Sequence, residues 1–159
     1  YGAWLETTFQ MSLTTLGLAS TVVGLAEAAG EFGAMALTDR LGKRRSVVAG
    51  LLGLAASLLI LPCLAGLGLA PALAGVVLMM LTVEFSIVSM LPLATELAVE
   101  SRAAVFSLNI MTTSLGRILG GVIGGWLWQW ENIALHAGVG AGCALAGALI
   151  LARGVRGFK

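Results

Sequence analysis

Four ionisable residues lie inside long apolar stretches of this sequence and are its main candidates for chemistry. Glu27 and Glu31 are one helical turn apart, Glu84 is near the middle of another stretch, and Arg117 is near the middle of a third. In hydrocarbon, each such charge must face a partner or a watery cavity, because burying it alone is costly. We therefore expect these residues to contact a substrate or to take part in proton coupling. Glu84 is the leading candidate for titrating a proton or contacting a cation.

Structural roles for these charges remain open. Arg117 could be the counter-charge of Glu84, an anion contact, or half of a buried pair that only fixes how two helices pack. Glu31 could instead pair with the basic residues that follow its apolar stretch. His136, the single histidine, lies near the beginning of the last stretch, at its outer boundary. We expect an interfacial position for it, and a proton relay is the alternative.

A short charged run separates the first two apolar stretches. It reads Asp39-Arg40-Leu41-Gly42-Lys43-Arg44-Arg45. Such a run cannot lie in hydrocarbon, so we expect a polar turn between two membrane spans. Because basic residues near the ends of spans stay on the cytoplasmic side, the run also predicts the orientation of the chain.

The composition independently indicates a membrane protein. Hydrophobic residues make up 58% of the 159 residues and charged residues 11%, whereas soluble domains carry about 25% charged residues. Five apolar stretches reach the roughly 20 residues that a helix needs to cross about 30 Å of hydrocarbon. They are residues 13–37, 47–69, 72–97, 105–128 and 133–152. We predict an all-α, polytopic transmembrane helix bundle with five spans, forming one unit over residues 1–159.

The positions of the basic residues predict the topology of these spans. Successive spans cross the membrane in alternating directions. If residues 38–46 are cytoplasmic, the turn at 99–103 and the tail from residue 153 are therefore cytoplasmic too. These segments hold eight of the nine basic residues: Arg40, Lys43, Arg44, Arg45, Arg102, Arg153, Arg156 and Lys159. The opposite boundary carries the aromatic residues Tyr1, Trp4, Trp126, Trp128 and Trp130. We predict a multi-pass protein of the cell membrane with loop 38–46 and the C-terminus in the cytoplasm.

The positions of the charged residues also indicate which spans face lipid and which face the protein interior. Residues 47–69 and 133–152 hold no acidic or basic residue apart from His136, so we expect them to face lipid. The other three spans each carry an ionisable group at depth, so we expect them to face the protein interior or a cavity.

The fourth span carries a ridge of glycines that predicts close helix packing. The ridge consists of Gly116, Gly120 and Gly124, with Gly121 and Gly125 beside them. Small residues let helix backbones approach and pack by dispersion in lipid. A gating role, in which glycine permits sliding or bending, is the alternative.

Other function classes find little support. Cys63 and Cys143 stand singly in apolar spans, so we predict buried packing residues and neither a zinc site nor a disulfide. The sequence suggests no metal, cofactor or catalytic cluster, which argues against an enzyme. A net charge of +1 with cations at membrane-edge turns does not suggest nucleic-acid binding.

The charged run resembles the cytoplasmic signature loop of the major facilitator superfamily. There, a Gly-x-x-x-Asp-Arg-x-Gly-Arg-Arg pattern joins the second helix to the third and the eighth to the ninth. Asp39, Arg40, Gly42 and the basic run match, whereas the first glycine of the pattern would fall at Met35. The chain looks like half of such a transporter without its first helix, a fragment that begins at Tyr1. We favour the second half, helices eight to twelve, because the third span has no arginine and the chain ends soon after its basic tail.

The resemblance implies alternating access, in which two six-helix bundles rock about a central site. It also implies a charged cytoplasmic latch made of Asp39, Arg40, Gly42, Lys43, Arg44 and Arg45; an orientation signal without a gating role is the alternative. We predict a secondary transporter of a small-molecule substrate, with protons as a candidate coupling ion. Its other partners are the lipid bilayer and the missing N-terminal half. The alternative function is a non-transporting receptor or assembly subunit that reuses the fold.

Overall fold

The structure, a computed structural model, describes residues 1–97 and 99–154. It consists of helices joined by short links, in the following order: α1 (Gly2–Phe9), α2 (Leu13–Leu41), α3 (Lys43–Gly66), α4 (Leu69–Leu97), the 3-10 turn η1 (Val99–Ser101), α5 (Arg102–Leu127), the 3-10 turn η2 (Trp128–Trp130) and α6 (Ile133–Gly154). Helices α2 to α6 are each long and apolar enough to cross a membrane. The predicted all-α fold with five spans is therefore confirmed.

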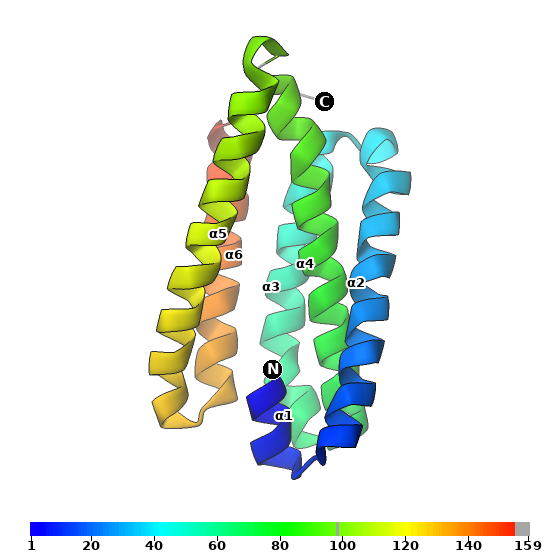
Figure 1. Ribbon diagram of the computed structural model, residues 1–159, viewed down its shortest axis with the longest axis vertical. Coiled ribbons are helices and arrows are strands. Elements are labelled where there is room, and N and C mark those ends of the chain that lie inside the picture. Colours follow the sequence, from blue (N-terminus) through cyan, green and yellow to red (C-terminus); the bar gives the residue numbers. More distant parts are fainter. Residues whose placement is uncertain (98, 155–159) are drawn as a thin grey trace.

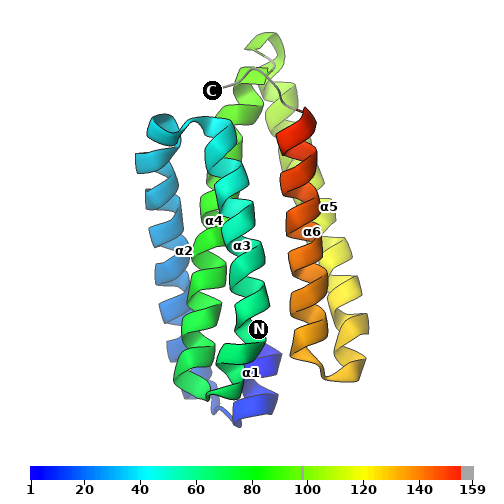
Figure 2. The same cartoon turned by 180° about the vertical axis from the view of Figure 1, so that it is seen from behind.

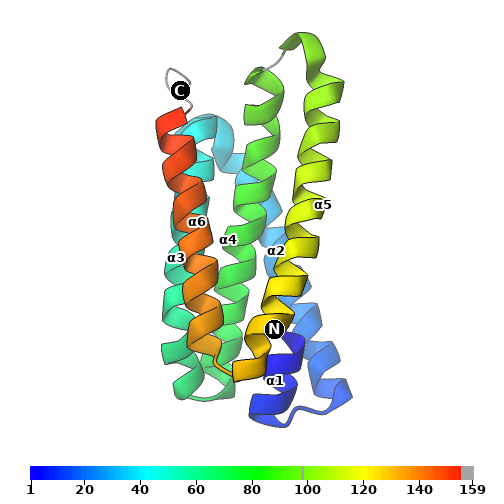
Figure 3. The ribbon, with the colours of Figure 1, turned by 90° about the vertical axis from the view of Figure 1, so that its left-hand side faces the viewer.

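The five long helices run roughly side by side in an elongated bundle (Figure 1). Helices α3 and α4 form the central pair, α2 packs on α4, and α6 packs on α3. Figure 2 shows α3 and α6 together on one side, and Figure 3 shows α4 between that side and α5. The two spans without charges at depth thus share one side of the bundle.

The two ends of the bundle differ in chemistry. One end, called the basic end here, contains the junction at Gly42, the turn η1 and the last residues of α6 (Figure 1). Six of the predicted cytoplasmic cations lie there: Arg40, Lys43, Arg44, Arg45, Arg102 and Arg153. The last two, Arg156 and Lys159, and the C-terminus lie outside the described residues. The opposite, aromatic end contains α1 and η2.

The predicted polar turn at residues 39–45 is much shorter in the structure. Helix α2 continues to Leu41 and α3 begins at Lys43, so Gly42 alone separates them. Gly42 has a φ of 90°, a conformation that residues with a Cβ rarely adopt. Its N–H donates to the carbonyl oxygen of Thr38 at 3.0 Å. Most of the charged run is therefore helical, and its backbone groups are hydrogen-bonded within α2 and α3.

At the aromatic end, residues 1–12 contain a helix that the sequence analysis did not predict. Trp4 and Leu5 of α1 are buried in a cluster with Val23, Leu61 and Val76. Trp4 therefore lies at the aromatic end, as predicted, but its side chain is part of the hydrophobic core. Both Cys63 and Cys143 are exposed, so their predicted burial was wrong. The reason is that no helix within the described part of the chain covers the faces of α3 and α6 that carry them.

Candidate functional site

The three acidic candidates meet where α2 approaches α4. The two helices lie close together at Gly30, which is between Glu27 and Glu31 in the sequence. A Cβ at Gly30 would lie 2.5 Å from the carbonyl oxygen of Leu81 and 3.1 Å from Cβ of Glu84. The glycine therefore allows α2 to lie directly against the turn of α4 that carries Glu84.

Arg117 of α5 completes a cluster of four charges, called the acidic cluster here. The charges of Glu27, Glu31 and Arg117 all act on the carboxylate of Glu84. Glu27 and Glu84 are half-buried, whereas Glu31 and Arg117 are exposed. Within residues 1–97 and 99–154, the members form no salt bridge with one another. The arrangement brings the four sequence candidates together without locking them into pairs.

A second polar group lies at the basic end. Lys43 forms a salt bridge with Glu96 near the end of α4. The Nη2 group of Arg44 donates a hydrogen bond to the carbonyl oxygen of Ala152 in α6. The start of α3 is thus tied to the ends of both neighbouring helices.

The other members of the charged run lie on the surface. Asp39, Arg40 and Arg45 are exposed. Asp39 lies in the last turn of α2, where the negative end of the helix dipole disfavours a carboxylate unless cations are close.

Buried hydroxyl groups between the helices were not identified from the sequence. Thr38 and Ser89 are buried and hydrogen-bonded to each other, with 2.8 Å between their oxygens, joining α2 to α4. Nearer the aromatic end, Ser57 and Thr82 join α3 to α4 at 3.4 Å. A signal did exist, because Thr38 continues a buried stripe of small residues on α2 at a spacing of four: Ala26, Gly30 and Ala34. Met35, which aligns with the first glycine of the signature pattern, is exposed.

The glycine ridge of α5 has a different environment. A Cβ at Gly116, Gly120, Gly121, Gly124 or Gly125 would meet no atom within 4 Å. Helix α5 contacts α4 and α6 only sparsely. The packing role of this ridge therefore stays a prediction, and any partner would come from outside the described residues.

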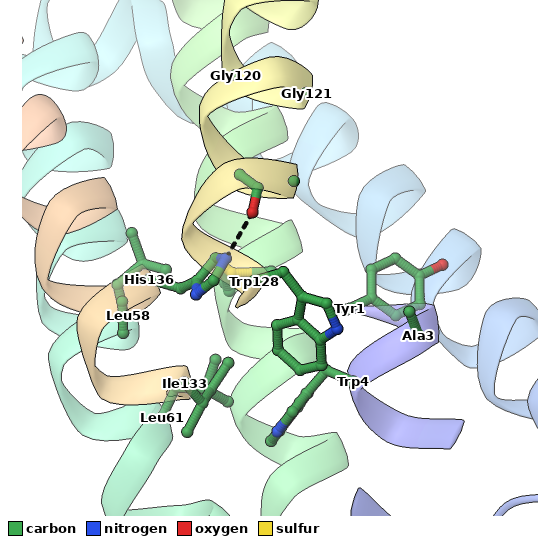
Figure 4. Close-up of a pocket in the computed structure, with 14 residues that line it drawn as sticks. Tyr1, Ala3, Trp4, Leu58, Leu61, Gly120, Gly121, Trp128, Ile133 and His136 are labelled. Atoms are coloured by element: carbon green, nitrogen blue, oxygen red, sulfur yellow. Dashed lines mark hydrogen bonds between the residues drawn. The ribbon is translucent and has the colours of Figure 1, made fainter. Parts of the chain in front are cut away.

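A cavity of about 450 Å³ lies at the aromatic end, beside α1, α5 and α6 (Figure 4). His136 borders it and donates from Nε2 to the carbonyl oxygen of Gly124 at 2.9 Å. The ring of His136 also meets the ring of Trp128 edge-on, with 5.5 Å between centroids. None of the described residues that line the cavity carries a carboxylate. These contacts join α6 to α5 and favour the interfacial position for His136 over a proton relay.

Comparison with protein families assigns the chain. A model described as Major Facilitator Superfamily matches residues 1–157. The chain belongs to the major facilitator superfamily. No curated protein and no solved structure matches it. As a superfamily member with five apolar helices, it is a multi-pass membrane protein of a transporter family rather than of an enzyme family.

Proposed function

We propose that the protein is a secondary active transporter that moves a small solute by alternating access, with Glu84 as the proton-coupling group. The observation that carries this proposal is the acidic cluster, in which charges from α2 and α5 lie close enough to act on the carboxylate of Glu84 in α4. Ionisable groups held at depth in membrane proteins mark substrate, ion or proton pathways. Membership of the superfamily supports the same activity.

The cluster is suited to exchange of a proton or a cation. Glu84 is half-buried at the contact between α2 and α4, whereas Arg117 is exposed on a helix that packs loosely. A movement of α5 would change the distance from Arg117 to Glu84 and hence the affinity of that carboxylate for a proton or cation. Motion of one helix would in this way be coupled to ion binding.

The charged run at the basic end is the gate in this proposal. The basic end faces the cytoplasm, as the positive-inside rule requires. Lys43 and Arg44 hold the start of α3 against α4 and α6, and the exposed Asp39 and Arg40 are available to the N-terminal half of the transporter. Opening requires those contacts to rearrange.

Transport in proteoliposomes tests the coupling role. The full-length parent protein is reconstituted and screened with a mixed panel of metabolites and drugs under an imposed pH gradient. We expect accumulation of a panel compound that the Glu84→Gln variant abolishes. Glu6→Gln is the matched control, because Glu6 is an exposed carboxylate on α1. Normal accumulation by Glu84→Gln would remove this residue from the coupling mechanism.

The gate is tested by Asp39→Asn in the same vesicles. We expect normal membrane insertion and slower transport, because the charge that responds to nearby cations is lost. Unchanged uptake would refute the gating role and leave the run as an orientation signal. Movement of no compound by correctly oriented, folded wild-type protein would count against transport itself and favour the receptor or assembly role.

A further inference from the structure

A small pocket at the basic end combines cations with an apolar wall. Its volume is about 270 Å³, and it lies between α3 and α6. Six residues line it: Arg44, Arg45, Val48, Ala49, Leu52 and Ala152. None of the residues of the acidic cluster takes part. The pocket is therefore separate from the acidic cluster, although Arg44 and Arg45 belong to the charged run that forms the proposed gate.

The lining follows one outward face of α3. Arg45, Ala49 and Leu52 are three to four residues apart, which places them on the same side of the helix, and all three are exposed. The cations lie in the first turn of α3, and the apolar residues lie one and two turns further along the helix. In a membrane this order places the cations at the depth of lipid headgroups and the apolar wall at the depth of acyl chains.

The guanidinium of Arg44 is held in place and brings a positive charge to the pocket. Its Nη2 group is bound to the carbonyl oxygen of Ala152. Its Nε–H is buried and has no hydrogen-bond partner within the part of the chain that the structure describes. A ligand in the pocket cannot reach this buried Nε, so any charge-assisted bond from Arg44 to an ionised oxygen comes from the Nη groups of the same guanidinium.

We infer that this pocket binds an anionic phospholipid, with the phosphate between Arg44 and Arg45 and an acyl chain along Ala49 and Leu52. Charge complementarity selects the headgroup, because the pocket offers two cations and none of the described residues that line it is acidic. Basic pockets between membrane helices are suited to acidic headgroups. The apolar wall favours a lipid over a free phosphate, since a soluble anion would leave that wall uncovered.

Lipid binding to the full-length protein tests the inference. The protein is purified in detergent, and retention of phosphatidylglycerol, phosphatidylcholine and glycerol 3-phosphate is compared by native mass spectrometry with titration. We expect phosphatidylglycerol to bind about ten-fold or more tightly than phosphatidylcholine. The reason is that phosphatidylglycerol carries a net negative charge, whereas the choline cation of phosphatidylcholine neutralises its phosphate. Glycerol 3-phosphate should bind weakly. Equal binding of the two lipids, or glycerol 3-phosphate binding as tightly as phosphatidylglycerol, would overturn the assignment.

Variants locate the site. Arg44→Gln should weaken phosphatidylglycerol binding by about ten-fold or more, because it removes a fixed positive charge together with its charge-assisted hydrogen bonds. Arg45→Gln should weaken it about five-fold, the usual effect of one basic residue near an acidic membrane surface. Arg45 is exposed, so this second variant serves even if Arg44→Gln does not fold.

Two further variants complete the test. Arg102→Gln is the matched control, because Arg102 is an exposed cation at the same end that does not line the pocket; we expect wild-type binding. Ala49→Phe should weaken the binding of phosphatidylglycerol by filling the apolar wall. Equal losses from Arg45→Gln and Arg102→Gln would show diffuse charge attraction instead of a site.

Discussion

Helices α2 and α5 carry the same pattern of small residues and use it differently. On α2, Ala26, Gly30, Ala34 and Thr38 recur every four residues and are buried. On α5, the glycines of the ridge recur every four residues and meet no atom within 4 Å. The most apolar stretch of α2 is 22% buried, and that of α5 is 0% buried.

The comparison shows that spacing alone does not identify a helix contact. Small residues permit close approach, but a neighbouring helix must present a matching surface. Helix α4 does this for α2 with the backbone of Leu81 and the hydroxyl of Ser89. The other residues of α4 near this contact include Glu84, so the packed seam also positions the acidic cluster.

The largest effect is expected at Gly30, where α2 and α4 lie close together. Gly30→Ala places a Cβ 2.5 Å from the carbonyl oxygen of Leu81, so the helices must separate. We expect a loss of about 1–3 kcal/mol of stability, as for other overpacked sites, measured by thermal unfolding of the purified full-length protein. Gly24→Ala on the same helix is the control, because its Cβ would meet nothing within 4 Å. Equal stability of the two variants would contradict the close approach.

The buried hydroxyl pair should give a smaller effect. Thr38→Val and Ser89→Ala each remove one partner of the 2.8 Å hydrogen bond. Such bonds between membrane helices contribute about 0.6 kcal/mol on average and up to about 1.7. We expect a coupling energy in that range from a double-mutant cycle on thermal stability. Strictly additive losses would show that the two hydroxyls act independently.

The salt bridge at the basic end should matter less for stability. The side chains of Lys43 and Glu96 are 22% and 43% exposed, so water and salt screen the pair. We expect Glu96→Gln to cost at most about 1 kcal/mol. The exchange of both residues, Lys43→Glu with Glu96→Lys, should recover most of that loss. A loss that is unchanged in high salt would rule out a screened ion pair.

The smallest effect is expected on α5. Gly120→Ala adds a Cβ where no described atom lies within 4 Å, so we expect a change within about 0.5 kcal/mol in the same unfolding assay. This variant also sharpens the comparison of the two helices. A loss as large as that of Gly30→Ala would show that the ridge packs tightly against a segment outside the described residues.

The amino-acid sequence was enough to assign the class of the protein and to place its basic residues at the ends of the predicted spans. Apolar stretches long enough to span a membrane, and cations confined to their ends, follow from local composition. The five helices and the gathering of the described cations of loop 38–46, Arg102 and Arg153 at one end therefore agree with the prediction. The signature run likewise led to the family that the comparison confirmed.

Which faces of the helices are in contact could be seen only in the folded structure. Rotation of a helix about its axis is set by packing against its neighbours, and lipid gives no hydrophobic drive that would reveal it in the sequence. For this reason the contact at Gly30, the pairing of Thr38 with Ser89, and the burial of Trp4 were not predicted. The same reason applies to Arg44, whose fixed guanidinium depends on where α6 ends beside α3.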